Sequence, residues 1–194
     1  MKANVGMLYP VAAPISAYTP GAAPTYGTGL VLEEARAATV TWNRADGRFY
    51  GDDVELDSYN GVLGYTIDFE PTGLTDAGRA AILGEVAASD EYTITDVASP
   101  SVGFGYIRRM RATQTNGTVS EAFEAWWYYK IRFSLNSEET RTREQDIEWR
   151  TPTLNGTGAG VQLTSGGPLS FAVHESFTTL AAAKTWLNGK AGIS

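Results

Sequence analysis

The sequence predicts a mainly β protein, a single-domain β-sandwich or barrel with one or two short flanking α-helices. The chain has 194 residues, enough for one sizeable core, and 43% of them are hydrophobic, as is typical of a globular domain. Several segments alternate apolar and polar residues, which is the period of a β-strand. No repeat, linker or change in charge divides the chain, so we expect one domain over residues 1–194.

The clearest strand runs from Phe123 to Leu135, where apolar residues occupy the odd positions and mostly polar residues the even ones. Upstream, Asn116-Gly117 is a strong signal for a two-residue hairpin turn. A turn there sets the register by counting, and it places Tyr106 opposite Trp127 and Arg109 opposite Glu124. The same register places Phe104 opposite Tyr129, Ile107 opposite Trp126, Met110 opposite Phe123 and Arg108 beside Ala125.

The N-terminal residues 1–29 are expected to form an arm and a loop. Val5 to Ala13 is apolar, but Pro10 cannot donate a hydrogen bond to a neighbouring strand, which favours an edge strand or an arm. The stretch Pro14 to Gly29 is rich in proline and glycine and reads as a turn-rich loop.

The middle of the chain predicts two strands joined by a turn. Leu30 to Asn43 is the first strand, and Asp46-Gly47 supplies a turn within Ala45 to Arg48. Phe49-Tyr50 and Asp52 to Asp57 then continue the β pattern. Val62 to Glu70 is the second strand, with Leu63, Tyr65, Ile67 and Phe69 on one face and Thr66, Asp68 and Glu70 on the other.

Two helices are predicted. The first spans Leu74 to Gly84, with Thr75 or Asp76 as its N-cap and Gly84 as its left-handed end. The second spans Thr178 to Leu187 and stops at Asn188-Gly189.

The remaining segments alternate loops and short strands. Ala88 to Val102 is expected to be a loop with a short strand at Tyr92 to Ile94. Strands at Ile147 to Leu154 and Gly160 to Leu163 are expected to flank a flexible Asn155 to Gly158, and Leu169 to His174 completes the set. The strongly charged stretch Ser137 to Asp146 precedes them.

No motif predicts catalysis, a cofactor or a metal. The chain lacks cysteine, so it has no disulfides or thiolate metal sites, which is compatible with a reducing cytoplasm. Asp53, Glu55 and Asp57 have the spacing of a calcium loop without its required glycine and bidentate glutamate. His174 is the single histidine, and no Gly-x-Ser-x-Gly elbow nominates a serine to work with it. We therefore expect no enzyme.

Net charge and hydropathy argue against binding of nucleic acid and against a membrane-spanning segment. The formal net charge is −7, which does not suit binding of nucleic acid by phosphate neutralisation. No apolar run approaches the roughly 20 residues that cross a bilayer, and the first residues do not form a secretory signal.

Trp126 and Tyr128 fall on what should be the polar face of their strand. Such aromatic residues can form a platform for sugars, but burial against a helix or a neighbouring subunit is the commoner use. Two readings therefore stay open at this position.

The order of these pieces resembles the major tail tube proteins of long-tailed phages. The residues that carry the resemblance run from end to end: Val5-Gly-Met-Leu-Tyr-Pro-Val-Ala12, Arg48-Phe-Tyr-Gly-Asp-Asp53, Gly64-Tyr65, Leu83-Gly84, the aromatic hairpin Tyr106 to Phe133 and Thr151-Pro-Thr-Leu154. The resemblance implies a homohexameric ring that stacks into the tail tube of the virion, assembled in the bacterial cytoplasm, through which DNA passes without specific binding.

The resemblance also implies where the copies meet. By position, the segments for stacking are 1–29, 46–61 and 137–147. Within the last two segments we take Tyr50, Asp52, Asp53, Glu138, Arg141 and Arg143 as candidate inter-subunit residues, and the aromatic pattern of the hairpin adds Trp126 and Tyr128. Further partners implied are tail-tip, tape-measure and tail-terminator proteins, and no membrane. Asp68 and Glu70 are the candidates for the channel lining, because a negative lumen repels phosphate.

Two other classes of function remain as alternatives. One is a carbohydrate-binding β-sandwich that uses Trp126, Tyr128 and Trp149, and the other is an enzyme with carboxylates near His174. Within the assembly class, another ring-forming virion part or a secretion-tube component would fit the same features.

Overall fold

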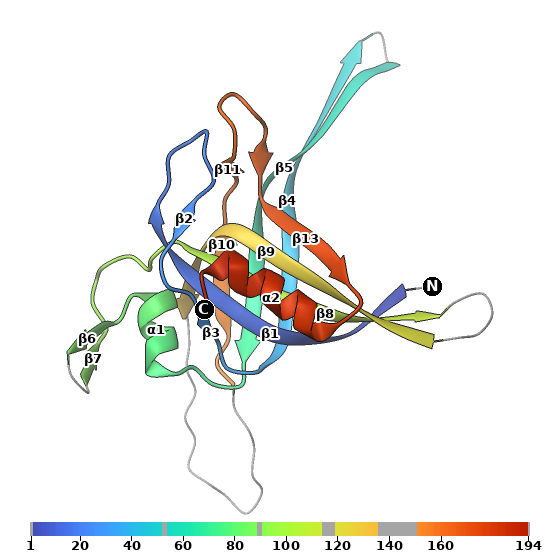
Figure 1. The fold of residues 1–194 in the computed structure, drawn as a ribbon. Helices are drawn as coiled ribbons and strands as arrows, with labels where there is room; N and C mark the ends of the chain where they lie inside the picture. The colour runs from blue at the N-terminus through green and yellow to red at the C-terminus, as the bar shows by residue number, and fades with distance from the viewer. Residues whose placement is uncertain (1, 52–53, 89–90, 114–118, 136–150, 194) are drawn as a thin grey trace, which may run out of the picture.

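The structure is a computed structural model, and it describes residues 2–51, 54–88, 91–113, 119–135 and 151–193 (Figure 1). The described residues form thirteen strands and two helices. The longer strands are β1 (Lys2–Ala17), β4 (Ala35–Gly51), β5 (Val54–Pro71), β8 (Val102–Thr113), β9 (Val119–Leu135), β10 (Leu154–Gly158) and β13 (Ala172–Phe177). The shorter strands are β2 (Thr25–Tyr26), β3 (Leu30–Val31), β6 (Val86–Ala88), β7 (Glu91–Thr93), β11 (Val161–Gln162) and β12 (Leu169–Ser170). The helices are α1 (Asp76–Leu83) and α2 (Leu180–Ala191).

One large antiparallel sheet organises the described chain. Its strand order is β2-β1-β8-β9-β10-β5-β4, and β3 and β13 pair with β1 and β9 outside this path. Strand β9 is long enough for two partners on one edge: residues 123–128 pair with β13 and residues 131–135 pair with β10. The protein is therefore mainly β with short helices, and this predicted fold class is confirmed.

The sheet curls around an inner core. Ala12 from β1 and Tyr65 from β5 lie near opposite ends of the strand order, yet both belong to the same buried cluster. The other members of this cluster are Leu32, Ile67, Phe69, Ile82, Val102, Phe104, Tyr106, Tyr128, Ile131, Phe133 and Leu154. The predicted inward face of Tyr65, Ile67 and Phe69 is confirmed, whereas Leu63 is 66% exposed.

Helix α2 covers the opposite side of the same sheet. It lies across β1, β8 and β9 (Figure 1) and buries Ala183, Leu187 and Ala191 against Val11, Ile107 and Trp127. Because this part of the sheet is covered on both faces, its strands need apolar residues at consecutive positions. That explains why Trp127 and Tyr128, adjacent in sequence, are both fully buried.

The register of the β8–β9 hairpin differs from the prediction by one residue. Tyr106 lies opposite Trp126 and Arg108 opposite Glu124, and the last described pair is Thr113 with Val119. A one-residue slip moves side chains to the other face, so Arg108 no longer sits beside Ala125. The predicted turn at Asn116-Gly117 lies outside the described residues.

The turn predicted at Ala45 to Arg48 is wrong. Strands β4 and β5 stay paired through Asp46 opposite Asn60 and onwards to Gly51 opposite Val54. Asp-Gly is compatible with a turn but does not require one, and here the cross-strand partner continues past it. The hairpin is therefore much longer than the sequence predicts.

The N-terminal segment is a strand of the sheet rather than an arm. Between Lys2 and Pro14, β1 pairs with β8 except at two bulges, and the second half of β1 also pairs with β2 and β3. Pro10 is accommodated by a bulge, because the register shifts between Leu8 and Val11 and Tyr9 adopts φ 52°. The carbonyl of Pro10 accepts a hydrogen bond from Leu32 N at 2.8 Å.

The segment Asn155 to Gly158 is not a flexible linker but most of strand β10, which lies between β9 and β5. A Cβ at Gly158 would lie 2.0 Å from Tyr65 Cζ, and one at Gly156 would lie 2.4 Å from Ile131 Cδ1. Glycine is required here because the large neighbouring side chains fill the space above the strand. The glycines that suggested a loop are therefore residues of a strand, where they make room for the side chains of Ile131 and Tyr65.

Helix α1 matches its prediction and α2 is longer than predicted. Thr75 caps α1, with its side chain accepting from Gly78 N at 3.1 Å, and Gly84 ends it at φ 78°. Helix α2 passes through Asn188-Gly189 and ends at Gly192 with φ 66°. The added turn places Ala191, which is fully buried, against the sheet, although an interior glycine costs a helix roughly 1 kcal/mol.

The other predicted strands are partly confirmed. The expected strand at Tyr92 to Ile94 is β7, and those at Gly160 to Leu163 and Leu169 to His174 are β11, β12 and β13. Of the predicted strand Ile147 to Leu154, residues 147–150 lie outside the described residues and residues 151–153 are not in a strand. Among the described residues, neither helix is both long and apolar enough to span a membrane.

Candidate assembly surface

The outer face of β4, β5, β10 and the second half of β9 is polar. Helix α2 covers the sheet over β1, β8 and the first half of β9 and does not reach these strands. Two rows of residues run across the four strands in register. One row is Thr39, Asp68, Asn155 and Ser134, and the other is Thr41, Thr66, Thr157 and Arg132. We call these eight residues the four-strand polar face.

The predicted channel residues lie on or beside this face. Asp68 is exposed and accepts a hydrogen bond from the Asn155 side chain. Glu70 is half-buried two residues further along β5 than Asp68, opposite Ala37. Arg132 is the cation of the two rows, and its guanidinium donates to Ser101 Oγ at 3.3 Å. The face is rich in hydroxyls and carries no cluster of cations that would hold phosphate groups.

The β4–β5 hairpin extends well beyond the core and projects away from the body of the molecule (Figure 1). Asp46, Gly47 and Arg48 are exposed there, and Arg44 donates to Asn60 Oδ1 at 3.3 Å across the pair. Of the predicted contact residues in this region, Tyr50 lies in β4 opposite Glu55, and Asp52 and Asp53 lie outside the described residues.

Strand β4 is the last strand in the sheet order, and part of it lies close to β1 without pairing with it. It pairs with β5 on one side, and no other described strand forms backbone hydrogen bonds with its outer edge. An edge of 17 residues is long for a protein that remains monomeric, because unpaired N–H and C=O groups attract further strands.

Trp126 is the centre of a polar and aromatic cluster at the other end of the inner face. The imidazole of His174 stacks on its indole with ring centroids 4.4 Å apart, and the guanidinium of Arg108 lies 4.4 Å from its centroid. Strands β13 and β8 flank β9 on opposite sides, so Trp126 is held from both sides. Trp126 Nε1 donates to Glu124 Oε2 at 2.7 Å, and His174 Nδ1 lies 3.5 Å from Glu124 Oε1.

Tyr128 is a core residue of its own chain, which corrects its prediction as an inter-subunit contact. Its side chain is fully buried, and its hydroxyl lies 3.4 Å from that of Tyr106. Burial raises the pKa of Tyr128 because the phenolate would lose its hydration. With Tyr128 inside and Trp126 stacked between two partners, neither ring is a free platform for a sugar, and Trp149 lies outside the described residues.

Among the described residues, His174 lies beside the carboxylate of Glu124. His174 and Glu124 form an imidazole–carboxylate pair, but no described contact brings a serine or threonine hydroxyl to this histidine. No group of three histidine, aspartate or glutamate side chains among the described residues could hold a metal ion. The cluster therefore has the form of a structural stack.

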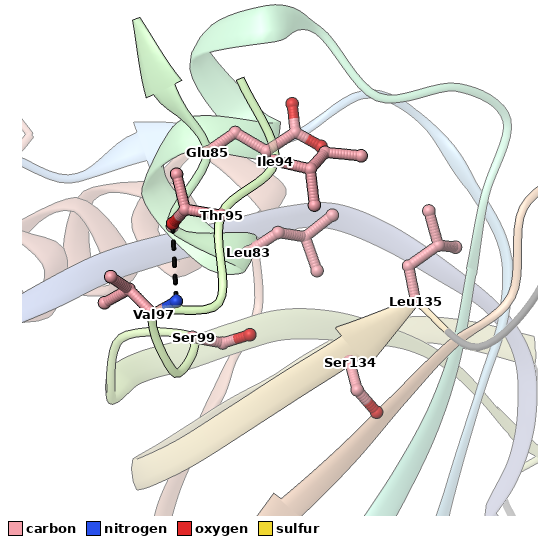
Figure 2. Close-up of a pocket in the computed structure, with 9 residues that line it drawn as sticks. Leu83, Glu85, Ile94, Thr95, Val97, Ser99, Ser134 and Leu135 are labelled. Carbon is pink, nitrogen blue, oxygen red and sulfur yellow. Dashed lines mark hydrogen bonds between the residues drawn. The ribbon is translucent and has the colours of Figure 1, made fainter. Parts of the chain in front are cut away.

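A pocket of about 230 Å³ lies where α1, the loop after β7 and the end of β9 meet (Figure 2). Leu83, Ile94, Val97 and Leu135 form its apolar walls. Its carboxylate, Glu85, is engaged by Arg79 at 3.3 Å, so the pocket offers apolar surface rather than reactive groups. Figure 2 also shows the hydrogen bond from Val97 N to Thr95 Oγ1 that shapes the loop after β7.

The remaining predicted contact residues, Glu138, Arg141 and Arg143, lie outside the described residues. Two features of the surface had no signal in the sequence that we recognised. The partners of Trp126 come from three strands, and Arg108 reached it only through the corrected register. The four-strand polar face depends on β10 lying between β9 and β5, which the glycine-rich pattern concealed.

In comparisons with known proteins, no protein-family model matches the chain and no curated protein matches it.

Proposed function

We propose that this protein is a structural subunit that assembles with copies of itself into closed rings, which stack as a tail tube of the phage type. The single observation that carries the proposal is the unpaired 17-residue edge of β4. Such an edge can pair with a strand of a second copy, and a head-to-tail contact that closes on itself forms a ring.

The four-strand polar face supports a channel. If β4 pairs across a subunit boundary, this face continues from one copy to the next and lines a common surface. Its hydroxyls and the carboxylate of Asp68 give it little attraction for phosphate. DNA would slide along such a lining without binding to it.

The long β4–β5 hairpin supports stacking of rings. Residues 46–51 and 54–60 lie beyond the inner core, and a lone domain has no evident need of them. On this proposal the protein acts in the virion tail, with tail-tip, tape-measure and tail-terminator proteins as partners at the tube ends. A secretion-tube subunit would use the same surface.

A shortened hairpin tests the proposal. Residues 46–60 are replaced by Asn-Gly, which joins Ala45 to its partner Gly61 by a two-residue turn and keeps the register. We expect the variant to fold with unchanged thermal stability and to sediment as a smaller species than the unmodified protein at high concentration. Sedimentation velocity over a concentration series measures this difference.

The matched control is Gly47→Ser, which keeps the hairpin length. A Cβ at Gly47 meets no atom within 4 Å, so this variant should fold and assemble like the parent. If the shortened variant and the parent sediment alike at every concentration, the hairpin has no role in assembly. If the parent itself stays monomeric throughout, the proposal fails.

A further inference from the structure

The loop after β7 carries the two most exposed large hydrophobic side chains that the structure describes. Ile94 is 77% exposed and Val97 is 68% exposed, and the exposed Asp96 lies between them in sequence. The hydrogen bond from Val97 N to Thr95 Oγ1, 3.4 Å long, holds the loop in a turn (Figure 2). Ile94 and Val97 form one side of the 230 Å³ pocket and remain largely exposed. We call residues 94–97 the knob: two exposed aliphatic side chains with a carboxylate and a hydroxyl between them in sequence.

A second pocket, of about 400 Å³, lies between the first half of β1, the β3–β4 connection and the start of α2. Met7, Leu8, Val31, Leu32 and Leu180 are among its apolar walls. Val31 is itself 42% exposed at this site. The volume accommodates two aliphatic side chains.

Two charged residues line this pocket, Lys184 on α2 and Glu34 before β4. The Lys184 ammonium lies 4.6 Å from the centroid of the Tyr9 ring, and the Tyr9 hydroxyl donates to Asn188 Oδ1 at 2.9 Å. Lys184 is therefore held in place without a carboxylate partner among its described contacts. An incoming carboxylate would find a positioned cation.

The backbone at this pocket is unusual. Tyr9 is the one described residue other than glycine with a positive φ, at 52°. The register of β1 against β8 shifts between Leu8 and Val11, so this bulge lies in the wall of the pocket. Backbone strain of this kind is kept where the surrounding structure over-determines it, and it gathers at binding sites.

We propose that the knob of one copy inserts into this pocket of a second copy. Ile94 and Val97 fill the apolar volume, Asp96 pairs with Lys184, and the Thr95 hydroxyl donates to Glu34. This inference rests on the proposed function, because its partner is a second copy of the same chain. Knob and pocket are different surfaces, so the contact is head-to-tail, the kind that closes into a ring.

The knob and the pocket are separate surfaces of one copy, because the residues that line the pocket include none of the knob. In Figure 1 the β6–β7 hairpin, which the knob follows, lies towards the C-terminal end of α2, whereas Leu180 and Lys184 belong to the first half of that helix. Each copy therefore offers one knob and one pocket to two different neighbours.

Exchanging the two charges tests the contact. Asp96→Lys and Lys184→Glu each place like charges across the interface and should raise the concentration needed for assembly by about tenfold or more. A 1:1 mixture of the two variants again matches Lys with Glu and Asp with Lys, so it should assemble like the parent. Sedimentation velocity of each variant and of the mixture gives the answer.

The apolar part has its own variant and control. Ile94→Ser should weaken assembly in the same way and leave the thermal stability of the subunit unchanged, since its side chain is mostly exposed. Val86→Ser is the matched control, because Val86 in the β6–β7 hairpin is 52% exposed but lies outside the knob. It should assemble like the parent.

The outcomes separate this inference from the proposed function. If the parent assembles and the charge variants assemble equally well, or if their mixture gains nothing, the knob and pocket are not the contact and self-assembly stands. If the parent does not assemble at all, both proposals are overturned.

Discussion

Gly158 lies directly against the ring of Tyr65, and a Cβ at this position would come within 2.0 Å of Tyr65 Cζ. The ring cannot move away easily, because it is fully buried and its hydroxyl donates to Lys130 O at 2.9 Å. Gly158→Ala should therefore destabilise the fold by about 3 kcal/mol or more through overpacking. Urea denaturation measures the change, with Gly47→Ala as a control in open space, for which we expect less than about 0.5 kcal/mol.

Trp127 is the largest fully buried side chain and connects the sheet to α2. It stacks edge-on with Tyr26 at 5.2 Å and donates to the Tyr26 hydroxyl at 3.3 Å. Trp127→Ala should lower the free energy of unfolding by roughly 3–5 kcal/mol. Leu169→Ala, at a side chain that is 58% exposed, should lower it far less in the same denaturation experiment, and equal losses would contradict this account of the core.

Buried tyrosines make the fold sensitive to alkali. Burial raises the pKa of Tyr26 from 10.0 to about 12 and also raises the pKa values of Tyr65 and Tyr128. Above pH 10 the unfolded chain loses these protons while the folded chain keeps them. Ionisation therefore stabilises the unfolded state relative to the folded state. Their contribution to stability is complete below pH 10 and should fall as the pH rises from 10 towards 12. Denaturation midpoints across that window measure this, and a constant midpoint would contradict it.

At this scale the sequence predicted the inward residues of single strands well and the partners of Trp126 poorly. Tyr65, Ile67 and Phe69 are buried as their alternation indicated, because alternation is a local property. The stack of Arg108, Trp126 and His174 joins three strands, and it depends on a register that no local pattern specifies.

The elements show the same division between local and distant causes. Helix α1 was predicted to within two residues because its cap residues are adjacent to it in sequence. The register of β8 and β9 was off by one because it was counted from an assumed two-residue turn, whereas pairing resumes at Thr113 and Val119. Strand β10 was missed because its glycines serve side chains from β5 and β9.

The N-cap of α1 provides a test at the scale of the element. The Thr75 hydroxyl accepts from Gly78 N, and removing it leaves an N–H of the first turn without its partner. Thr75→Ala should destabilise the protein by about 1 kcal/mol, and Thr75→Ser should restore most of the loss. Thermal unfolding of the three proteins decides, and equal stability of all three would mean that the cap is unimportant.

For the whole molecule, the order of strands decides which residues share a surface. The four-strand polar face exists because β10 inserts between β9 and β5, bringing Asn155 beside Asp68 and Ser134. The sequence predicted Asp68 and Glu70 as surface acids of one strand but not the strands beside them. Strand order is set by contacts between distant parts of the chain, which periodicity does not report.

The central claim is that copies of this chain join through the unpaired edge of β4 into closed rings. Electron microscopy of the purified, concentrated protein in negative stain tests it most directly. The account predicts annular particles and, on longer incubation, stacked tubes with a central channel. A field of uniform small globules at every concentration and incubation time would contradict it.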